Sequence, residues 1–250
     1  MELYYHSQFT AKMPDKIYFF VDPNKVSDNK FSLNKLESHH LIKVLRKTLG
    51  TEIWLIDGIG SAYYGIVQNM QNDIASGLIL ETFPKYGENK IQISLGIGIL
   101  KKDKMNFVIE KATECGVNEF IPLILDKCIK RDVNLDRLLK ISISAVKQCG
   151  RSVIPGISRP SDLNELLNTY SNSSIFVFHE SGKDGVDILP QLLKNQSKIL
   201  LLIGPEGDFS KKELSLLKEK KANFINLGNR RLRSETAVIA ALSQIDLYSN

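Results

Sequence analysis

Two short glycine-bearing segments near the end of the chain carry residues suited to chemistry. The first is Gly204-Pro205-Glu206-Gly207-Asp208, in which glycines let the backbone approach a ligand closely. The second is the run LGNRRLRSETA, which contains Arg233 and Glu235. A guanidinium is a permanent cation that can stabilise a developing anion, and a nearby carboxylate can orient it or accept a proton. A purely structural Arg233–Glu235 ion pair is the alternative, and it stays open.

Both segments follow sequences that are typical of buried strands. Residues 199–203 form a short apolar run, and residues 224–227 form a second one. The pattern from Ser210 to Glu213 predicts a capping box and hence a helix after the first loop. Ser234 is suited to cap a last helix. Two loops therefore leave the carboxyl ends of two strands, where ligands bind in open parallel sheets. An ordinary α/β domain without a cofactor is the alternative.

The segments GPEGD and LGNRRLRSETA, in this order, resemble the GPEGG…LGxRxLRTETA pair of the SPOUT-type methyltransferases. The match is closest to members that methylate N3 of a uridine in small-subunit (16S) ribosomal RNA. The resemblance implies an α/β fold, with a carboxy-terminal SPOUT domain whose parallel sheet contains a trefoil knot. It also implies S-adenosylmethionine as cofactor and a homodimer whose partner subunit completes the site. Asp208 replaces a usual glycine, and we expect this to change cofactor affinity.

The same resemblance assigns the cofactor to three loops. The cofactor-binding residues that it implies are His179, Glu180, Leu202, Ile203, Gly204, Pro205, Glu206, Gly207, Leu227, Gly228, Leu232, Arg233, Thr236 and Ala237. The catalytic residues are Arg233 and Glu235. His179 also suits a general base, because histidine titrates near neutral pH, but a polar loop residue beside the cofactor is the favoured alternative.

Two further segments extend the resemblance toward the amino terminus. SHHLIKVLRKTLGTEIWLIDG resembles the HLxxVLR…GDxIxLxDG stretch of the family's PUA-like RNA-binding barrel. It implies that Arg46 and Lys47 bind RNA, which needs only cations positioned against phosphates. QCGRSVIP resembles the family's EQSGRxxVP, with Lys147 at the usual acidic position. Arg151 is then either an RNA-facing or structural residue of the site, or an ordinary cation at a helix end.

The chain divides into two expected domains. Residues 1–83 should form the PUA-like β-barrel, residues 84–90 a linker, and residues 91–250 the SPOUT methyltransferase domain. In the last of these, strands alternate with helices, which predicts a parallel sheet covered on both faces. The expected strands are 17–21, 52–56, 63–67, 77–82, 91–100, 120–125, 174–178, 199–203 and 224–227, and the expected helices include 33–47, 105–115, 135–148 and 235–247.

Composition narrows the class of protein. The 250-residue chain has a formal net charge of +5, and residues 85–160 hold 14 basic against 8 acidic side chains, which favours a polyanionic partner. Three cysteines without CxxC spacing indicate reduced thiols in the cytoplasm, and no metal site. The first ten residues lack the pattern of a signal peptide, and no apolar run reaches the roughly 20 residues needed to cross a membrane.

These features predict methylation of a uridine N3 in small-subunit ribosomal RNA, with the RNA or the assembled 30S subunit as partner. One alternative is a SPOUT enzyme that acts on transfer RNA, and another is a non-catalytic RNA-binding module for ribosome assembly. The last helix carries more apolar surface than one core-facing stripe requires, which favours a dimer contact. Burial of that helix within its own domain is the alternative.

Overall fold

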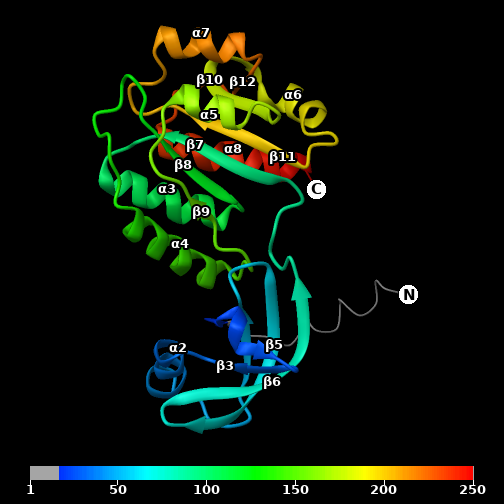
Figure 1. Ribbon diagram of the computed structural model, residues 1–250. Coiled ribbons are helices and arrows are strands. Elements are labelled where there is room, and N and C mark those ends of the chain that lie inside the picture. Colours follow the sequence, from blue (N-terminus) through cyan, green and yellow to red (C-terminus); the bar gives the residue numbers. More distant parts are fainter. Residues whose placement is uncertain (1–16, 250) are drawn as a thin grey trace. The chain divides into compact units, whose positions relative to one another are not determined.

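A computed structural model describes residues 17–249 of the chain. The first ten residues, on which the signal-peptide prediction rests, lie outside this range. The chain forms two compact units (Figure 1): Met1–Gly87 with Lys147–Val153, and Glu88–Val146 with Ile154–Asn250. The division after Gly87 falls inside the predicted linker. The assignment of Lys147–Val153 to the first unit was not predicted from the sequence.

The first unit is built on a six-stranded sheet with the order β1-β4-β5-β6-β3-β2. β1 and β4 are parallel and the other neighbours are antiparallel. The four strands expected here are confirmed, and β2 and β3 are additional. The elements are β1 (Tyr18–Phe20), η2 (Pro23–Lys25), β2 (Val26–Ser27), β3 (Lys30–Ser32), β4 (Glu52–Ile56), β5 (Ser61–Gln71) and β6 (Ile74–Pro84).

The helix expected at 33–47 is shorter than predicted. It consists of α2 (Lys35–His39) and a π-helical turn, η3 (His40–Val44). The backbone N–H of Leu45 donates to the His40 carbonyl at 2.9 Å, which is the wide turn of a π-helix. Arg46 then takes a left-handed conformation with φ +53°, and this ends the helix before the predicted boundary.

The segment Lys147–Val153 packs within the first unit, and two of its contacts explain residues noted in the sequence. Lys147 Nζ lies 2.7 and 2.9 Å from the two carboxylate oxygens of the buried Glu37, which gives the lysine at this position a partner. Gly150 has φ +77°, and a Cβ there would lie 2.4 Å from the Tyr18 ring. Arg151 is only 2% exposed. Its burial favours the structural role over an RNA contact, because a phosphate cannot reach a covered guanidinium.

The second unit contains a six-stranded sheet with the order β12-β10-β11-β7-β8-β9, in which all neighbours are parallel. The predicted parallel sheet is therefore confirmed. The elements are β7 (Gln92–Gly98), α3 (Lys102–Glu114), β8 (Glu119–Leu123), α4 (Leu135–Cys149), β9 (Gly156–Ile157), α5 (Leu163–Thr169), β10 (Ser174–Asp184), α6 (Gly185–Leu192), β11 (Lys198–Ile203), α7 (Lys211–Glu219), β12 (Asn223–Asn226) and α8 (Ser234–Ser249).

The apolar run of β11 explains why both faces of this sheet are covered. Ile199, Leu201 and Ile203 pack in a core cluster shared with α3, α6 and α8. Leu200 and Leu202 pack on the opposite face, with α5 and α7. Because side chains alternate along a strand, a continuous apolar run needs helices on both sides, as Figure 1 shows.

Helix α8 differs from its predicted form in two ways. It begins at Ser234 itself, so this serine is a helical residue rather than the cap. Its apolar side chains Val238, Ala241, Leu242 and Ile245 are buried in the core of their own unit. The alternative of burial within the domain therefore accounts for most of the apolar surface that had favoured a dimer. The trefoil knot stays a prediction.

Within residues 17–249, no helix has both the length and the apolar character needed to span a membrane.

Candidate functional site

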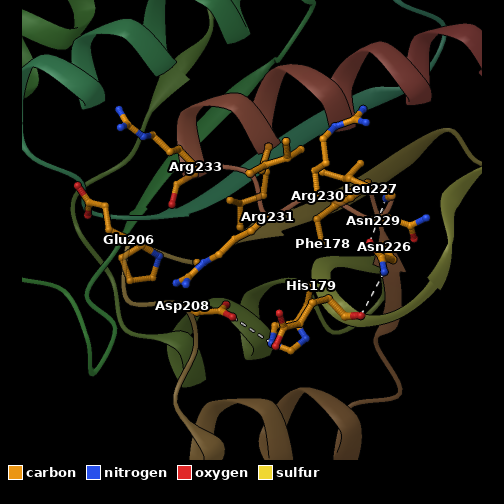
Figure 2. A pocket seen from close by; sticks show the side chains of 18 of the residues that line it. Phe178, His179, Glu206, Asp208, Asn226, Leu227, Asn229, Arg230, Arg231 and Arg233 are labelled. Carbon is orange, nitrogen blue, oxygen red and sulfur yellow. Dashed lines mark hydrogen bonds and ion pairs between the residues drawn. The ribbon is translucent and has the colours of Figure 1, made fainter.

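A cavity of about 760 Å³ lies in the second unit, beside the middle of β10 and the ends of β11 and β12 (Figure 2). Residues 178–180 of β10 and the loops that follow β11 and β12 form most of its wall, and the starts of α3 and α8 complete it. The lining residues are Lys104, Phe178, His179, Glu180, Ile203, Gly204, Pro205, Glu206, Asp208, Asn226, Leu227, Gly228, Asn229, Arg230, Arg231, Leu232, Arg233, Ser234 and Ala237.

The loop after β11 is a tight turn that leads directly into α7. The Asp208 N–H donates to the Pro205 carbonyl at 2.9 Å, and Asp208 has φ +63°. The predicted capping box is present, since the Ser210 hydroxyl and the Glu213 carboxylate each accept from the other residue's backbone N–H. A Cβ on Gly204 would lie 3.1 to 3.2 Å from Asp208 atoms, so glycine permits this turn to close.

The segment after Phe178 is not a free loop, as the sequence had suggested. β10 continues to Asp184, with a register shift against β12 between Phe178 and Lys183. A Cβ on Gly182 would lie 2.4 Å from the backbone nitrogen of Ile225, so the glycine permits the close approach of the two strands. This bulge turns His179 and Glu180 into the wall of the cavity.

The loop between β12 and α8 brings several cations to the cavity. Asn226 accepts from the Gly228 N–H at 3.0 Å and donates to the Glu180 carbonyl at 3.2 Å, which ties this loop to the β10 bulge. Arg230, Arg231 and Arg233 follow, and all three are exposed. Figure 2 shows Arg231 extending toward Asp208, whereas Arg233 extends to the upper left of the view and Arg230 to the upper right.

Lys104, at the start of α3, joins two acidic residues at this site. Its Nζ lies 3.1 Å from Glu206 Oε1 and 4.0 Å from Glu235 Oε1. Burial opposes ionisation of Glu206, but hydrogen bonds from its own backbone N–H and from Lys104 outweigh it and lower its pKa. Glu206 is therefore an anion at neutral pH.

Glu235 faces Lys104 rather than Arg233. Among residues 17–249, no ion pair joins Arg233 and Glu235, so this geometry does not support the structural pair left open above. The second carboxylate oxygen of Glu235, Oε2, is buried and has no hydrogen-bond partner within the described chain. That oxygen has an unused acceptor position, but Glu235 is not among the residues that line the cavity.

Both ring nitrogens of His179 are occupied. The Ser181 N–H donates to Nδ1 at 3.0 Å, which places the ring proton of the neutral imidazole on Nε2. Nε2 lies 3.2 Å from Asp208 Oδ2. A general base needs a free lone pair, so this arrangement favours the polar loop residue over the general base.

Most residues expected to bind the cofactor come together at this cavity, and their role stays a prediction. Three others do not line it. Leu202 faces the core between the sheet and α5 and α7, Gly207 lies against Lys127, and Thr236 lies on an exposed part of α8 while Arg233, Ser234 and Ala237 reach the cavity. Strand alternation and helical periodicity account for these differences.

The cavity also contains residues outside the individually predicted set: Lys104, Phe178, Asp208, Asn226, Asn229, Arg230, Arg231 and Ser234. Five of them lie within the loops 203–208 and 227–237 that the resemblance assigns to the cofactor, and Phe178 and Asn226 adjoin predicted residues. Lys104 is different, because it is 102 positions from Glu206 in sequence and no local pattern connects the two.

In the first unit, Arg46 and Lys47 are both exposed, as a phosphate contact requires. Their role in RNA binding stays a prediction. No group of three or more His, Cys, Asp and Glu side chains arranged to hold a metal ion occurs among the residues that the structure describes.

Comparison with known families finds two matching domain models. Residues 87–246 match the RNA methyltransferase domain. Residues 33–80 match the RNA methyltransferase PUA domain. The first match covers most of the second unit, including the cavity, and the second lies within the first unit.

Curated relatives and a solved structure agree with these models. The chain is 30% identical to ribosomal RNA small subunit methyltransferase E of Rickettsia conorii, over 92% of this chain and 95% of that protein. It is 32% identical to the protein of the same name from Buchnera aphidicola subsp. Schizaphis graminum, over 92% and 94% of the two chains. The crystal structure of ribosomal RNA small subunit methyltransferase E from Neisseria gonorrhoeae bound to S-adenosyl methionine is similar, with a TM-score of 0.82, 27% identity, and 93% and 98% of the two chains covered.

Proposed function

Because the chain belongs to the ribosomal RNA small subunit methyltransferase E family, we propose that it methylates N3 of a uridine in small-subunit ribosomal RNA. The methyl donor is S-adenosylmethionine, which is bound in the structurally similar enzyme from Neisseria gonorrhoeae. The observation that carries the proposal is the cavity formed by the bulge of β10 and the loops after β11 and β12.

The residues of this cavity fit S-adenosylmethionine. A volume of about 760 Å³ lies within the usual range of small-molecule sites. Apolar side chains that suit an adenine ring come from Phe178, Ile203 and Leu227. The ionised Glu206 suits a positively charged ligand, and the tight turn at Gly204 lets backbone groups approach closely. When bound, the cofactor supplies an electrophilic methyl group on a sulfonium.

The protein's own contribution is to position the uracil ring and to manage the charge of N3. Uridine N3 carries a proton that must leave as the new N–C bond forms. We propose that the Arg233 guanidinium stabilises the negative charge that develops on the ring. Glu235 is the proton acceptor that we propose, and this role requires its buried, unpaired Oε2 to become exposed to the uracil ring. Lys104 Nζ lies 4.0 Å from the other oxygen of this carboxylate, beyond hydrogen-bonding distance, and places a positive charge beside it.

Arg46 and Lys47 are the RNA-binding residues that we propose in the first unit, since both are exposed cations in a segment that matches the PUA model. In the second unit, the exposed arginines of the loop before α8 add positive charge beside the cavity. Such cations attract a polyanion irrespective of its sequence.

Replacing Arg46 by asparagine should weaken RNA binding and leave cofactor binding unchanged. Asparagine tolerates the left-handed conformation at this position, so the variant removes charge with little strain. The slope of log affinity against log salt concentration should fall by about 0.7 to 0.9, the value for one phosphate contact. Lys25→Ala, which removes an exposed cation of η2, is the control. An unchanged slope in Arg46→Asn would rule out the phosphate contact.

The test of the proposed function is to map modified nucleotides in ribosomal RNA from cells that lack the protein. We expect one N3-methyluridine of the small-subunit RNA to be absent and to return on complementation. Loss of a modification in transfer RNA instead would favour the transfer RNA alternative. In vitro methylation of naked RNA and of 30S subunits then identifies the substrate.

We also propose a homodimer that acts in the cytoplasm. The three cysteines are free thiols, which is ordinary for cytoplasmic proteins. The family resemblance supports the dimer, and Leu247 of α8 is an exposed apolar side chain that a partner would cover. A substitution such as Ala241→Arg on α8 is not a suitable test of the dimer. Ala241 is fully buried, so an arginine at this position would disrupt the fold rather than an interface. Light scattering of the active wild-type enzyme is the suitable test, and a monomer mass would overturn the dimer.

A further inference from the structure

Asp208 adopts a backbone conformation that is costly for most residues. Its φ is +63°, in the left-handed region. Steric strain in this region is smallest for glycine, and it is smaller for aspartate than for most other residues. The residue closes the turn after β11 by donating its N–H to the Pro205 carbonyl. Glycine would make the same turn with less strain, so the contacts of the aspartate side chain determine what it contributes.

Those contacts connect two of the loops that wall the cavity. Asp208 Oδ1 accepts from the Phe209 N–H at 2.8 Å, which fixes the carboxylate against its own loop. Its Oδ2 lies 3.2 Å from Nε2 of His179, whose side chain is only 9% exposed. The Ser181 N–H donates to the other ring nitrogen of His179. The side chains thus form a continuous connection from the loop after β11 to the bulge of β10, as Figure 2 shows for Asp208 and His179.

The Asp208 carboxylate also lies close to the backbone of Gly204. A Cβ on Gly204 would lie 3.1 Å from Asp208 Oδ1 and 3.2 Å from its Cα. Asp208 and Gly204 are therefore too close together for a side chain at residue 204, and both residues line the cavity. His179 lines the cavity as well, so the spacing of the two loops is set by a contact at its wall.

We propose that Asp208 and His179 are a pair of positioning residues that hold the two loops at the spacing S-adenosylmethionine requires. The pair sets cofactor affinity, and His179 takes no part in proton transfer. The inference rests on the proposed function of the cavity. It differs from a general-base role for His179, because both ring nitrogens already have partners.

The first experiment measures cofactor affinity by calorimetry, and thermal stability, for Asp208→Gly. We expect the dissociation constant of S-adenosylmethionine to rise about threefold to tenfold, which corresponds to the typical net contribution of one hydrogen bond. The melting temperature should stay the same or rise, because glycine relieves the left-handed strain. Asp73→Gly is the matched control, since Asp73 has φ +60° in the first unit. It should raise stability in the same way and leave affinity unchanged.

The second experiment compares His179→Gln, His179→Ala and the double variant His179→Ala with Asp208→Gly. Glutamine carries an N–H that can replace Nε2–H, so His179→Gln should bind the cofactor more tightly than His179→Ala does. His179→Ala should weaken binding as Asp208→Gly does. The double variant should bind no more weakly than either single variant, because each removes the same contact.

The outcomes distinguish the pair from the proposed function. If the wild-type protein binds S-adenosylmethionine and Asp208→Gly binds it equally well, the positioning pair is overturned but the proposed function is not. An inactive His179→Gln that still binds the cofactor, or fully additive losses in the double variant, would have the same consequence. A wild-type protein that binds no S-adenosylmethionine would overturn the proposed function of the cavity, and the pair's role with it.

Discussion

Gly204→Val is expected to weaken binding of S-adenosylmethionine by about 10-fold to 100-fold, the equivalent of an overpacking cost of about 1–3 kcal/mol. Gly204 is buried, and its Cβ alone would lie 3.1 to 3.2 Å from three atoms of Asp208. The branched side chain of valine adds two methyl groups at this point. The turn from Pro205 to Asp208 must open to accommodate them, and the backbone that faces the cofactor moves with it.

Calorimetry with S-adenosylmethionine measures this effect, and circular dichroism shows whether the fold is kept. Gly156→Ala is a suitable control in the same unit, because its Cβ would meet only Glu119 Cγ at 3.9 Å. It should bind the cofactor as the wild type does. A folded Gly204→Val protein with wild-type affinity would show that this turn does not contact the cofactor.

Arg233→Ala is expected to lower turnover by about 10²- to 10³-fold, the usual effect of removing a group that stabilises a transition-state charge. Cofactor affinity should change much less, because the positive charge is needed only as the uracil ring becomes anionic. Arg233 is exposed at the start of α8 and its carbonyl accepts the first helical bond, from the Ala237 N–H at 2.8 Å. That backbone bond is unaffected by truncating the side chain.

Single-turnover rates at saturating RNA and cofactor separate this effect from weaker binding. Arg159→Ala removes the same charge from an exposed position that does not line the cavity, and should keep full activity. Equal losses of turnover and of cofactor affinity in Arg233→Ala would instead favour a structural role. Arg233→Lys should recover part of the rate, since lysine keeps the charge but lacks the planar fork.

The parts of the fold that were predictable are those with strong local signals. The apolar run of β11 required burial on both faces, and the structure places helices on both sides. The capping box of Ser210 and Glu213 involves residues three positions apart, so the start of α7 followed from the sequence alone. The glycines and arginines of the two loops likewise indicated a ligand site at the ends of the strands, because parallel strands bring such loops together.

Features that depend on distant residues escaped prediction. The helix expected at 33–47 stops early because a π-turn and the left-handed Arg46 interrupt it, although its composition is that of an ordinary helix. Lys147 was noted only as a departure from an acidic residue, and its reason is Glu37, 110 positions away. Arg151 was read as a possible RNA contact, and it is buried.

The same distinction applies to the site. Local sequence indicated which loops form it, but the partners of each charged group depend on how the strands are ordered in the sheet. That order sets Lys104 beside Glu206 and His179 beside Asp208. The surroundings of each carboxylate set its role. Glu206 is held ionised by Lys104, Glu235 keeps one unpaired oxygen, and Asp208 connects two segments through His179. Propensity acts over a few neighbouring residues, whereas these pairings arise only when packing brings remote segments within hydrogen-bonding distance.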